Sequence, residues 1–177
     1  MLILILGGSG SGKSEFGENL ALKLGKEKLY IATMKPFGQE SLDRIKKHRE
    51  MRKKKEFETY EIYKDFTNIN IEKSRECDVI LVECISNILA NEMFSENTVS
   101  ENVVDDILNG IKKILLKSKN TIIISNDINF DGNTYSKEVI EYQKKIGEIN
   151  RKIAVEAELV IEVVAGIPIY HKGEELC

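Results

Sequence analysis

The feature that most constrains the fold is a short apolar segment that leads directly into a run of glycines. Residues 2–6 are all large aliphatic side chains, which is typical of a strand buried on both faces. They are followed by Gly7-Gly8-Ser9-Gly10-Ser11-Gly12-Lys13-Ser14, a complete match to G-x-x-x-x-G-K-[ST]. A strand, a glycine loop and a helix in this order predict a phosphate-binding loop, or P-loop.

Each residue type in this loop has a role in binding phosphate. Glycines let successive backbone N–H groups turn toward phosphate oxygens at angles that a Cβ would hinder. Lys13 can place a cation on the β- and γ-phosphates, and the Ser14 hydroxyl can bind Mg²⁺. A flexible glycine loop with a chance lysine is the alternative, and the preceding strand argues against it. We therefore predict that residues 7–14 bind GTP or ATP together with Mg²⁺.

Apolar runs and amphipathic stretches alternate along the rest of the chain. The further segments predicted as strands are 28–32, 79–82, 121–125 and 159–164, with 57–63 as an additional strand nearer an edge. The segments predicted as helices are 14–25, 39–54, 84–94, 101–118 and 136–157. Because strands and helices alternate, we expect one α/β domain over residues 1–177, with helices on both sides of a mostly parallel sheet.

The strand at 79–82 ends in Glu83, a carboxylate suited to hold the water shell of a bound metal. Most P-loop enzymes have aspartate there, and an ordinary acid at a helix start is the alternative. We predict that Ser14 and Glu83 together hold Mg²⁺, in part through water. The turn-forming loop at 126–133 follows another buried strand, where parallel sheets bind ligands.

The net charge of −3 conceals a basic segment at 44–55, which holds eight of the 26 lysines and arginines. On a helix, Arg44, His48 and Arg52 recur at i, i+4 and i+8 and share one face. Fixed cations favour a neutral imidazole, which can attack phosphorus, so His48 is a candidate nucleophile. A solvated basic face is the plainer interpretation. Binding to nucleic acid is disfavoured by the acidic total and the lack of interleaved aromatics.

Composition excludes several other classes. With 42% hydrophobic and 31% charged residues, the chain has enough apolar material for a core and is not disordered. No apolar run approaches the roughly 20 residues that a membrane helix needs, and the N-terminus lacks the pattern of a signal peptide. Cys77, Cys84 and Cys177 form no C-x-x-C pair, which suits a reducing cytoplasm, and Cys77 and Cys84 are expected to be packing residues. His171 is expected at the surface without a role.

Together the motifs resemble the adenosylcobinamide kinase / adenosylcobinamide-phosphate guanylyltransferase family of cobalamin biosynthesis. The matching segments run in order along nearly the whole chain: GGSGSGKS, YIAT, ESLDRIKKHREMR, FETYE, LVECISNILAN, GEINRKIA and VVAGIP. The P-loop is generic, whereas R-I-x-x-H-x-x-x-R after I-A-T is close to diagnostic. The resemblance implies a P-loop NTPase fold of RecA-like type, a three-layer sandwich.

The resemblance also implies a bifunctional enzyme. One activity phosphorylates the aminopropanol hydroxyl of adenosylcobinamide, and the other transfers GMP from GTP to adenosylcobinamide phosphate through a guanylyl-histidine. The position that matches this histidine is His48. Positions that match family residues along the nucleotide are Ile31, Ala32, Thr33, Arg52, Glu61 and Glu83. Glu61 would accept from the guanine edge, Arg52 would reach phosphate, and the neighbouring Arg49 could also reach it. Family members are cytoplasmic homotrimers, so the same is expected here.

Two segments depart from the family pattern. Residues 126–133 replace N-E-V-G-x-G-I-V-P, and Tyr142-Gln143-Lys144 replaces F-R-D. This loop and helix are candidates for recognising the corrinoid, so one activity or the acceptor can differ. Two alternatives therefore stay open. One is a P-loop kinase for another small alcohol with a structural His48, and the other is a nucleotide-gated module that docks an acidic partner.

Overall fold

The computed structural model describes residues 1–36, 38–71, 77–94, 102–128 and 135–176; within the helix at 38–54, several side chains, including that of His48, lie outside the description. The strands are β1 (Leu2–Leu6), β2 (Lys28–Ala32), β3 (Glu58–Glu61), β4 (Cys77–Glu83), β5 (Ser118–Ile124), β6 (Leu159–Val164) and β7 (Ile167–Lys172). The helices are α1 (Lys13–Leu24), α2 (Gly38–Lys54), the 3₁₀ turn η1 (Phe66–Asn68), α3 (Ile85–Met93), α4 (Val103–Leu115) and α5 (Lys137–Glu156). None of the described helices is long and apolar enough to span a membrane.

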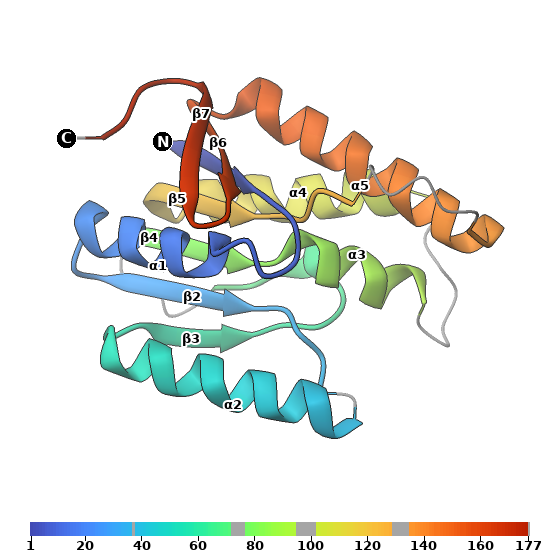
Figure 1. The fold of residues 1–177 in the computed structure, drawn as a ribbon, viewed down its shortest axis with the longest axis horizontal. Helices are drawn as coiled ribbons and strands as arrows, with labels where there is room; N and C mark the ends of the chain where they lie inside the picture. The colour runs from blue at the N-terminus through green and yellow to red at the C-terminus, as the bar shows by residue number, and fades with distance from the viewer. Residues whose placement is uncertain (37, 72–76, 95–101, 129–134, 177) are drawn as a thin grey trace.

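The strands form one sheet in the order β3-β2-β4-β5-β1-β6-β7 (Figure 1). Every pair of neighbours is parallel except β6 and β7, so the mostly parallel sheet is confirmed. The predicted end of one helix and the predicted start of the next strand were wrong. The helix predicted at 101–118 is too long, because α4 ends at Leu115 and β5 begins at Ser118. The antiparallel strand β7 was not predicted.

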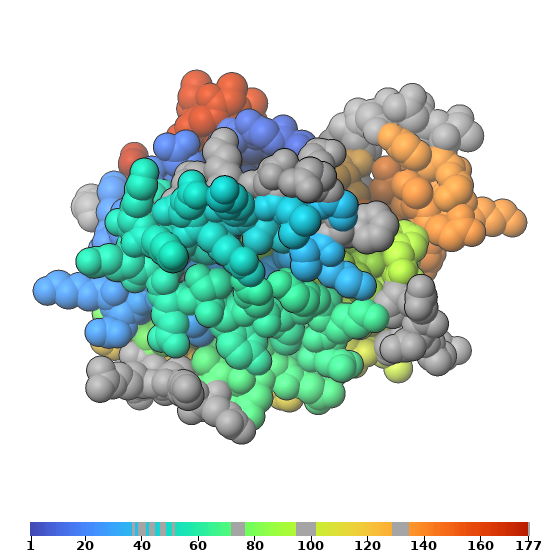
Figure 2. All heavy atoms as spheres, turned by 90° about the horizontal axis from the view of Figure 1, so that it is seen from below, coloured from blue at the N-terminus to red at the C-terminus, as the bar shows by residue number. Residues whose placement is uncertain are grey.

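Helices cover both faces of the sheet, which confirms the three-layer arrangement. Alternate side chains of β1 enter different cores: Ile3 and Ile5 pack with residues of α1, while Leu2 and Leu4 pack with residues of α3, α4 and α5. In Figure 1, α2 runs along β3 at the edge of the sheet. Seen from below, α2 and the segment that follows β3 cover this side of the molecule (Figure 2).

The strand register places the candidate site at one edge of the sheet. Ala32 of β2 is paired with both Glu61 of β3 and Glu83 of β4. Glu83 in turn is level with Ile124 of β5, and Ile124 with Ile5 of β1. Because these strands are parallel, their carboxyl ends all meet here, and the loops that follow them surround the P-loop.

A tight hairpin supports the P-loop from the other side. The turn between β6 and β7 consists of Ala165 and Gly166, whose φ angles are 49° and 82°. Positive φ at both central residues is what a two-residue type I′ turn requires. The Gly166 N–H donates to the Ser11 carbonyl at 2.8 Å, and a Cβ on Gly12 would lie only 3.3 Å from the Gly166 Cα. The hairpin therefore packs directly on the loop that is predicted to bind phosphate.

The turn makes opposite predictions for two substitutions of Ala165. Asparagine tolerates positive φ, so Ala165→Asn is expected to raise the free energy of unfolding by about 0.5–1 kcal/mol. Valine is β-branched and tolerates it poorly, so Ala165→Val is expected to lower stability. Chemical denaturation of the two variants checks this pair. If both substitutions changed the free energy of unfolding in the same direction, the assignment of a type I′ turn would be wrong.

Candidate active site at the carboxyl edge of the sheet

A cavity of about 510 Å³ lies where the strand ends meet the P-loop. Its walls come from the loop and the start of α1, from the ends of β2, β3, β4 and β5, and from α2. The predicted P-loop residues from Ser9 to Ser14 line it, together with Ala32, Thr33, Arg52, Glu61 and Glu83. Its volume is in the range of pockets that hold small ligands.

The P-loop has the backbone geometry that its glycines predict. Gly12 precedes the first residue of α1 and has a φ of 92°, a conformation that favours glycine. A Cβ on Gly7 would approach the Val163 carbonyl oxygen to 2.7 Å. Lys13 is buried, and its Nζ donates to the Gly8 carbonyl at 2.8 Å. The ammonium thus lies inside the loop whose N–H groups are expected to bind phosphate.

The carboxylate of Glu83 is held by two hydroxyl groups. Ser14 Oγ donates to Oε1 of Glu83, and the Tyr30 phenol donates to Oε2. Burial raises the pKa of Tyr30 well above its usual value, and the negative charge of Glu83 raises it further, so the phenol keeps its proton and remains a donor. The structure thus brings Ser14 and Glu83 into contact, and it adds Tyr30, which the sequence did not point to.

These side chains fit a magnesium ion. Hydroxyl and carboxylate oxygens are ligands of the kind that Mg²⁺ takes, and it is usually held by one or two protein carboxylates with phosphate and water completing its shell. Ser14 and Glu83 provide one hydroxyl and one carboxylate at the cavity wall. Within the described residues, no group of three or more His, Cys, Asp or Glu side chains offers a competing site.

Arg52, near the C-terminal end of α2, faces the same cavity. It is only 4% exposed, and its guanidinium carbon lies 4.3 Å from the centroid of the Tyr30 ring, in a cation–π contact. Its Nε is buried and has no hydrogen-bond partner. A buried donor of this kind is costly unless something accepts from it. Because Arg52 also lines the cavity, an anionic ligand group is a suitable acceptor.

Arg49 and Glu61 pair with each other. Arg49 Nη2 donates to Glu61 Oε1 at 2.5 Å, and the Tyr63 hydroxyl donates to Oε2 at 2.8 Å. These hydrogen bonds, that of Arg49 first, hold the pKa of Glu61 below its usual range. Glu61 lines the cavity, whereas Arg49 is largely exposed and is not among the described lining residues. The phosphate role of Arg49 and the guanine role of Glu61 remain predictions.

The last two residues of β2 and the residue that follows them are divided between the core and the cavity wall. The side chain of Ile31 is fully buried in the core below α3 and α4, so it does not line the cavity. Ala32 and Thr33 do line it. The Thr33 hydroxyl accepts from the Cys84 N–H at 2.6 Å, which ties the ends of β2 and β4 together. Of the predicted Ile-Ala-Thr contact, the structure therefore brings only its last two residues to the site.

His48 lies within α2, whose helical backbone confirms the spacing on which its role was argued. The side chains of His48 and Arg44 lie outside the described part of the chain. Ile45 and Arg52 both line the cavity, seven residues apart on the helix. His48 falls between them, at i+3 from Ile45 and i+4 before Arg52, so its position belongs to the same helical stripe. His171, by contrast, is exposed and pairs with Glu162 at 2.8 Å.

The contact between Tyr30 and Glu83 predicts a specific effect on metal-dependent binding. Tyr30→Phe removes one donor from the carboxylate, so the gain in affinity of a nonhydrolysable GTP analogue on adding Mg²⁺ should shrink by up to about tenfold. Its affinity in the presence of EDTA should not change. Calorimetric titration with and without Mg²⁺ measures both quantities, and Tyr170→Phe, on β7, is the matched control. An unchanged ratio would mean that Tyr30 does not position Glu83.

Comparisons with known proteins find similar sequences that extend over nearly the whole chain. Residues 3–170 match the sequence model of a family described as cobinamide kinase / cobinamide phosphate guanyltransferase. The bifunctional adenosylcobalamin biosynthesis protein CobP of Pseudomonas aeruginosa is 29% identical, over 98% of each chain. The corresponding protein CobU of Salmonella typhimurium is 26% identical, over 94% of this chain and 97% of its own.

Solved structures with the same fold are more distant in sequence. The flagellar accessory protein FlaH from Methanocaldococcus jannaschii superposes with a TM-score of 0.55 and 22% identity, over 98% of this chain and 78% of its own. The RadB recombinase gives a TM-score of 0.50 and 16% identity, over 91% and 73%. These similarities confirm the RecA-like P-loop NTPase fold. The match over residues 3–170 goes further, and the chain belongs to the cobinamide kinase / cobinamide phosphate guanyltransferase family.

Proposed function

We propose that this one cavity binds the nucleotide for both activities of the family, phosphorylation of a cobinamide and transfer of GMP to cobinamide phosphate. The observation that carries the proposal is the composition of the cavity wall. The P-loop, the Ser14–Glu83 pair and the α2 stripe that contains His48 all border the same space. A kinase needs the P-loop and the Ser14–Glu83 pair. An enzyme that carries GMP on a histidine needs the α2 stripe as well.

In the kinase reaction, the P-loop N–H groups and Lys13 bind the triphosphate and offset its charge. Ser14 and Glu83 would hold Mg²⁺, which would supply positive charge to offset the charge that develops on the phosphate. Tyr30 keeps the Glu83 carboxylate turned toward Ser14, since it occupies the second carboxylate oxygen. GTP and ATP share the triphosphate that these groups contact, so either can serve as phosphate donor.

In the guanylyl transfer, His48 is the nucleophile. An imidazole nitrogen attacks the α-phosphorus of GTP, the bond from that phosphorus to the bridging oxygen breaks, and pyrophosphate leaves with the electron pair. An oxygen of cobinamide phosphate then attacks the same phosphorus and releases the imidazole. Arg52 supports the role, because its buried Nε lies one helical turn away without a partner and can stabilise charge on the phosphate in flight.

Assembly and location are also proposed from the family. Family members form homotrimers in the cytoplasm, and we expect the same of this chain. The exposed apolar side chains Val164, Ile167 and Ile169 of the β6–β7 hairpin offer a surface that a second chain can cover. The free thiols of Cys77 and Cys84 are compatible with a reducing compartment.

The histidine role predicts a selective loss of one activity. After incubation with GTP and Mg²⁺, the intact protein should gain the mass of one GMP, and His48→Ala should abolish this adduct. Transfer of the γ-phosphate to cobinamide should survive in the same variant, because the P-loop and Glu83 are untouched. Mass spectrometry and a γ-³²P transfer assay measure the two outcomes.

His171→Ala is the matched control, because it removes the chain's other histidine from an exposed position. An adduct of equal yield in His48→Ala would exclude the covalent role. Phosphate transfer without any adduct in the unmodified protein would favour the simpler P-loop kinase. Binding of GTP with neither activity would favour a nucleotide-gated module.

A further inference from the structure

One wall of the cavity is built from amides rather than from phosphate-binding groups. Asn87, in the first turn of α3, and Asn126, just after β5, both line it. Asn126 Nδ2 donates to the Ser86 hydroxyl at 2.9 Å, and its carbonyl accepts from Asn150 of α5 at 3.2 Å. This wall is therefore fixed by hydrogen bonds to both α3 and α5, and it belongs to neither the P-loop nor the Ser14–Glu83 pair.

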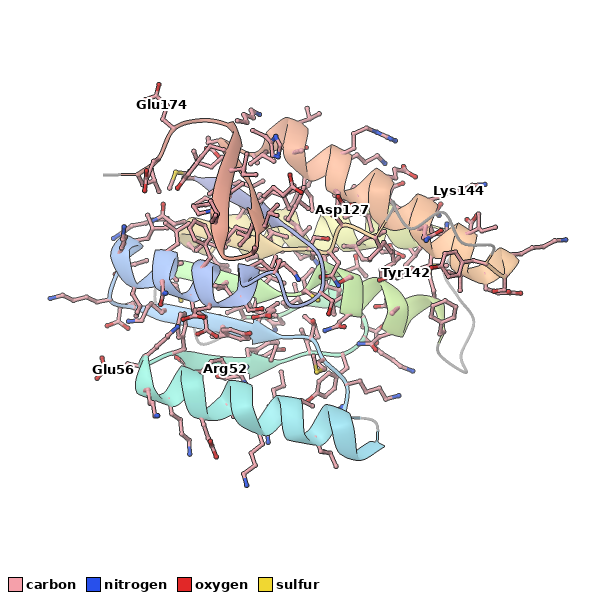
Figure 3. The ribbon with its side chains drawn as sticks, in the orientation of Figure 1. Arg52, Glu56, Asp127, Tyr142, Lys144 and Glu174 are labelled. Carbon is pink, nitrogen blue, oxygen red and sulfur yellow. The ribbon has the colours of Figure 1, made fainter. Side chains whose placement is uncertain are left out.

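An aromatic pair, Phe94 and Tyr142, lies at the far end of α3. Phe94 follows the last residue of α3, seven residues and about 10 Å beyond Asn87 along the helix axis. Its ring is 55% exposed and lies 6.1 Å from that of Tyr142, with the ring planes tilted by 41°. Tyr142 comes from α5, beside this end of α3 (Figure 3).

Tyr142 connects the aromatic pair to the amide wall. Its hydroxyl donates to the Ser86 carbonyl at 3.0 Å, next to Asn87 and within the turn that also bonds Asn126. Burial raises the pKa of Tyr142 to about 12, so the phenol stays a donor near neutral pH. Next to it, Gln143 donates to the Ile128 carbonyl at 3.3 Å and holds the start of the loop after β5. The aromatic surface is thus rigidly placed relative to the cavity.

A cobinamide acceptor has two parts that correspond to the amide wall and the aromatic pair. Its reacting group is a hydroxyl or phosphate at the end of a short arm, and the rest is a large flat macrocycle. A cavity of about 510 Å³ is the size of a pocket for one small ligand, so the macrocycle stays outside while its arm enters. A flat ring outside the mouth favours an exposed aromatic contact, because covering apolar area stabilises the complex.

We propose that Phe94 and Tyr142 form the subsite for the corrin macrocycle, and that Asn87 and Asn126 guide the acceptor arm toward the nucleotide. The inference rests on the proposed function, because it takes the acceptor to be a cobinamide. The occupant follows from continuity with the cavity: Phe94 directly follows the helix whose first turn forms the cavity wall. Phe94 and Tyr142 do not line the cavity themselves but lie beyond this wall, at the end of α3 and on α5.

Binding measurements on the purified full chain test the subsite without relying on turnover. Cobinamide and a nonhydrolysable GTP analogue are titrated separately into the unmodified protein, Phe94→Ala, Phe94→Gln and Leu116→Ala. The two Phe94 variants should bind cobinamide about tenfold more weakly and the GTP analogue unchanged. Leu116→Ala is the matched control, since its side chain is 85% exposed away from the cavity, and it should behave as the unmodified protein. Phe94→Tyr keeps the ring and should retain binding.

The possible results separate the subsite from the function on which it rests. Equal cobinamide affinity in both Phe94 variants and the unmodified protein would overturn the subsite and leave the proposed function intact. Binding of the GTP analogue but no cobinamide by the unmodified protein would overturn the acceptor class, and the subsite with it. A Phe94 variant that changes the sedimentation coefficient while cobinamide affinity is unchanged would assign the pair to an interface between chains.

Discussion

The carboxylate of Glu83 is the point on which the site depends. It accepts from Ser14, which belongs to the first helix, and from Tyr30, which belongs to a strand on the far side of β4 from β5. One side chain of β4 thus joins α1 and β2 at the cavity wall, although both lie more than fifty residues earlier in the chain. The two hydroxyl groups fix the position of both carboxylate oxygens at the cavity wall, where a metal ion would bind.

Several cations of the basic segment at 44–55 have partners within the chain. Arg49 pairs with Glu61, Arg52 lies on the ring of Tyr30, and Lys55 binds Glu18 of α1 at 2.6 Å. Among the described side chains of this segment, these three contact neighbours within the chain, whereas Lys46, Lys53 and Lys54 are exposed.

Much of this could be predicted because local chemistry dictates it. The strand at residues 2–6 is all aliphatic, and the loop after it matches a pattern whose every residue type has a role. The strand β7 was missed because Pro168 and the exposed His171 and Lys172 do not form an apolar run, and edge strands do not need one. The start of β5 was missed because its first residues are polar and continue the pattern of the preceding helix.

The contacts that complete the site could not be predicted from sequence patterns, because they join residues that are far apart in the chain. Tyr30 reads as an ordinary core residue of a strand, and only the fold brings its hydroxyl to Glu83, 53 residues away. Arg49 and Glu61 were each assigned to the nucleotide, yet strand β3 places them against each other. Tyr142 was noted as a departure from the family, and its bond to Ser86, 56 residues away, follows from the packing of α5 on α3.

The most direct test of one shared cavity is the number of nucleotides that each chain binds. Equilibrium dialysis with a nonhydrolysable GTP analogue in the presence of Mg²⁺ measures it, with ATP as competitor. A single cavity predicts one analogue per chain, displaced by ATP, and loss of binding in Lys13→Ala. A second equivalent per chain, or full binding in Lys13→Ala, would contradict the proposal that both activities use the same nucleotide site.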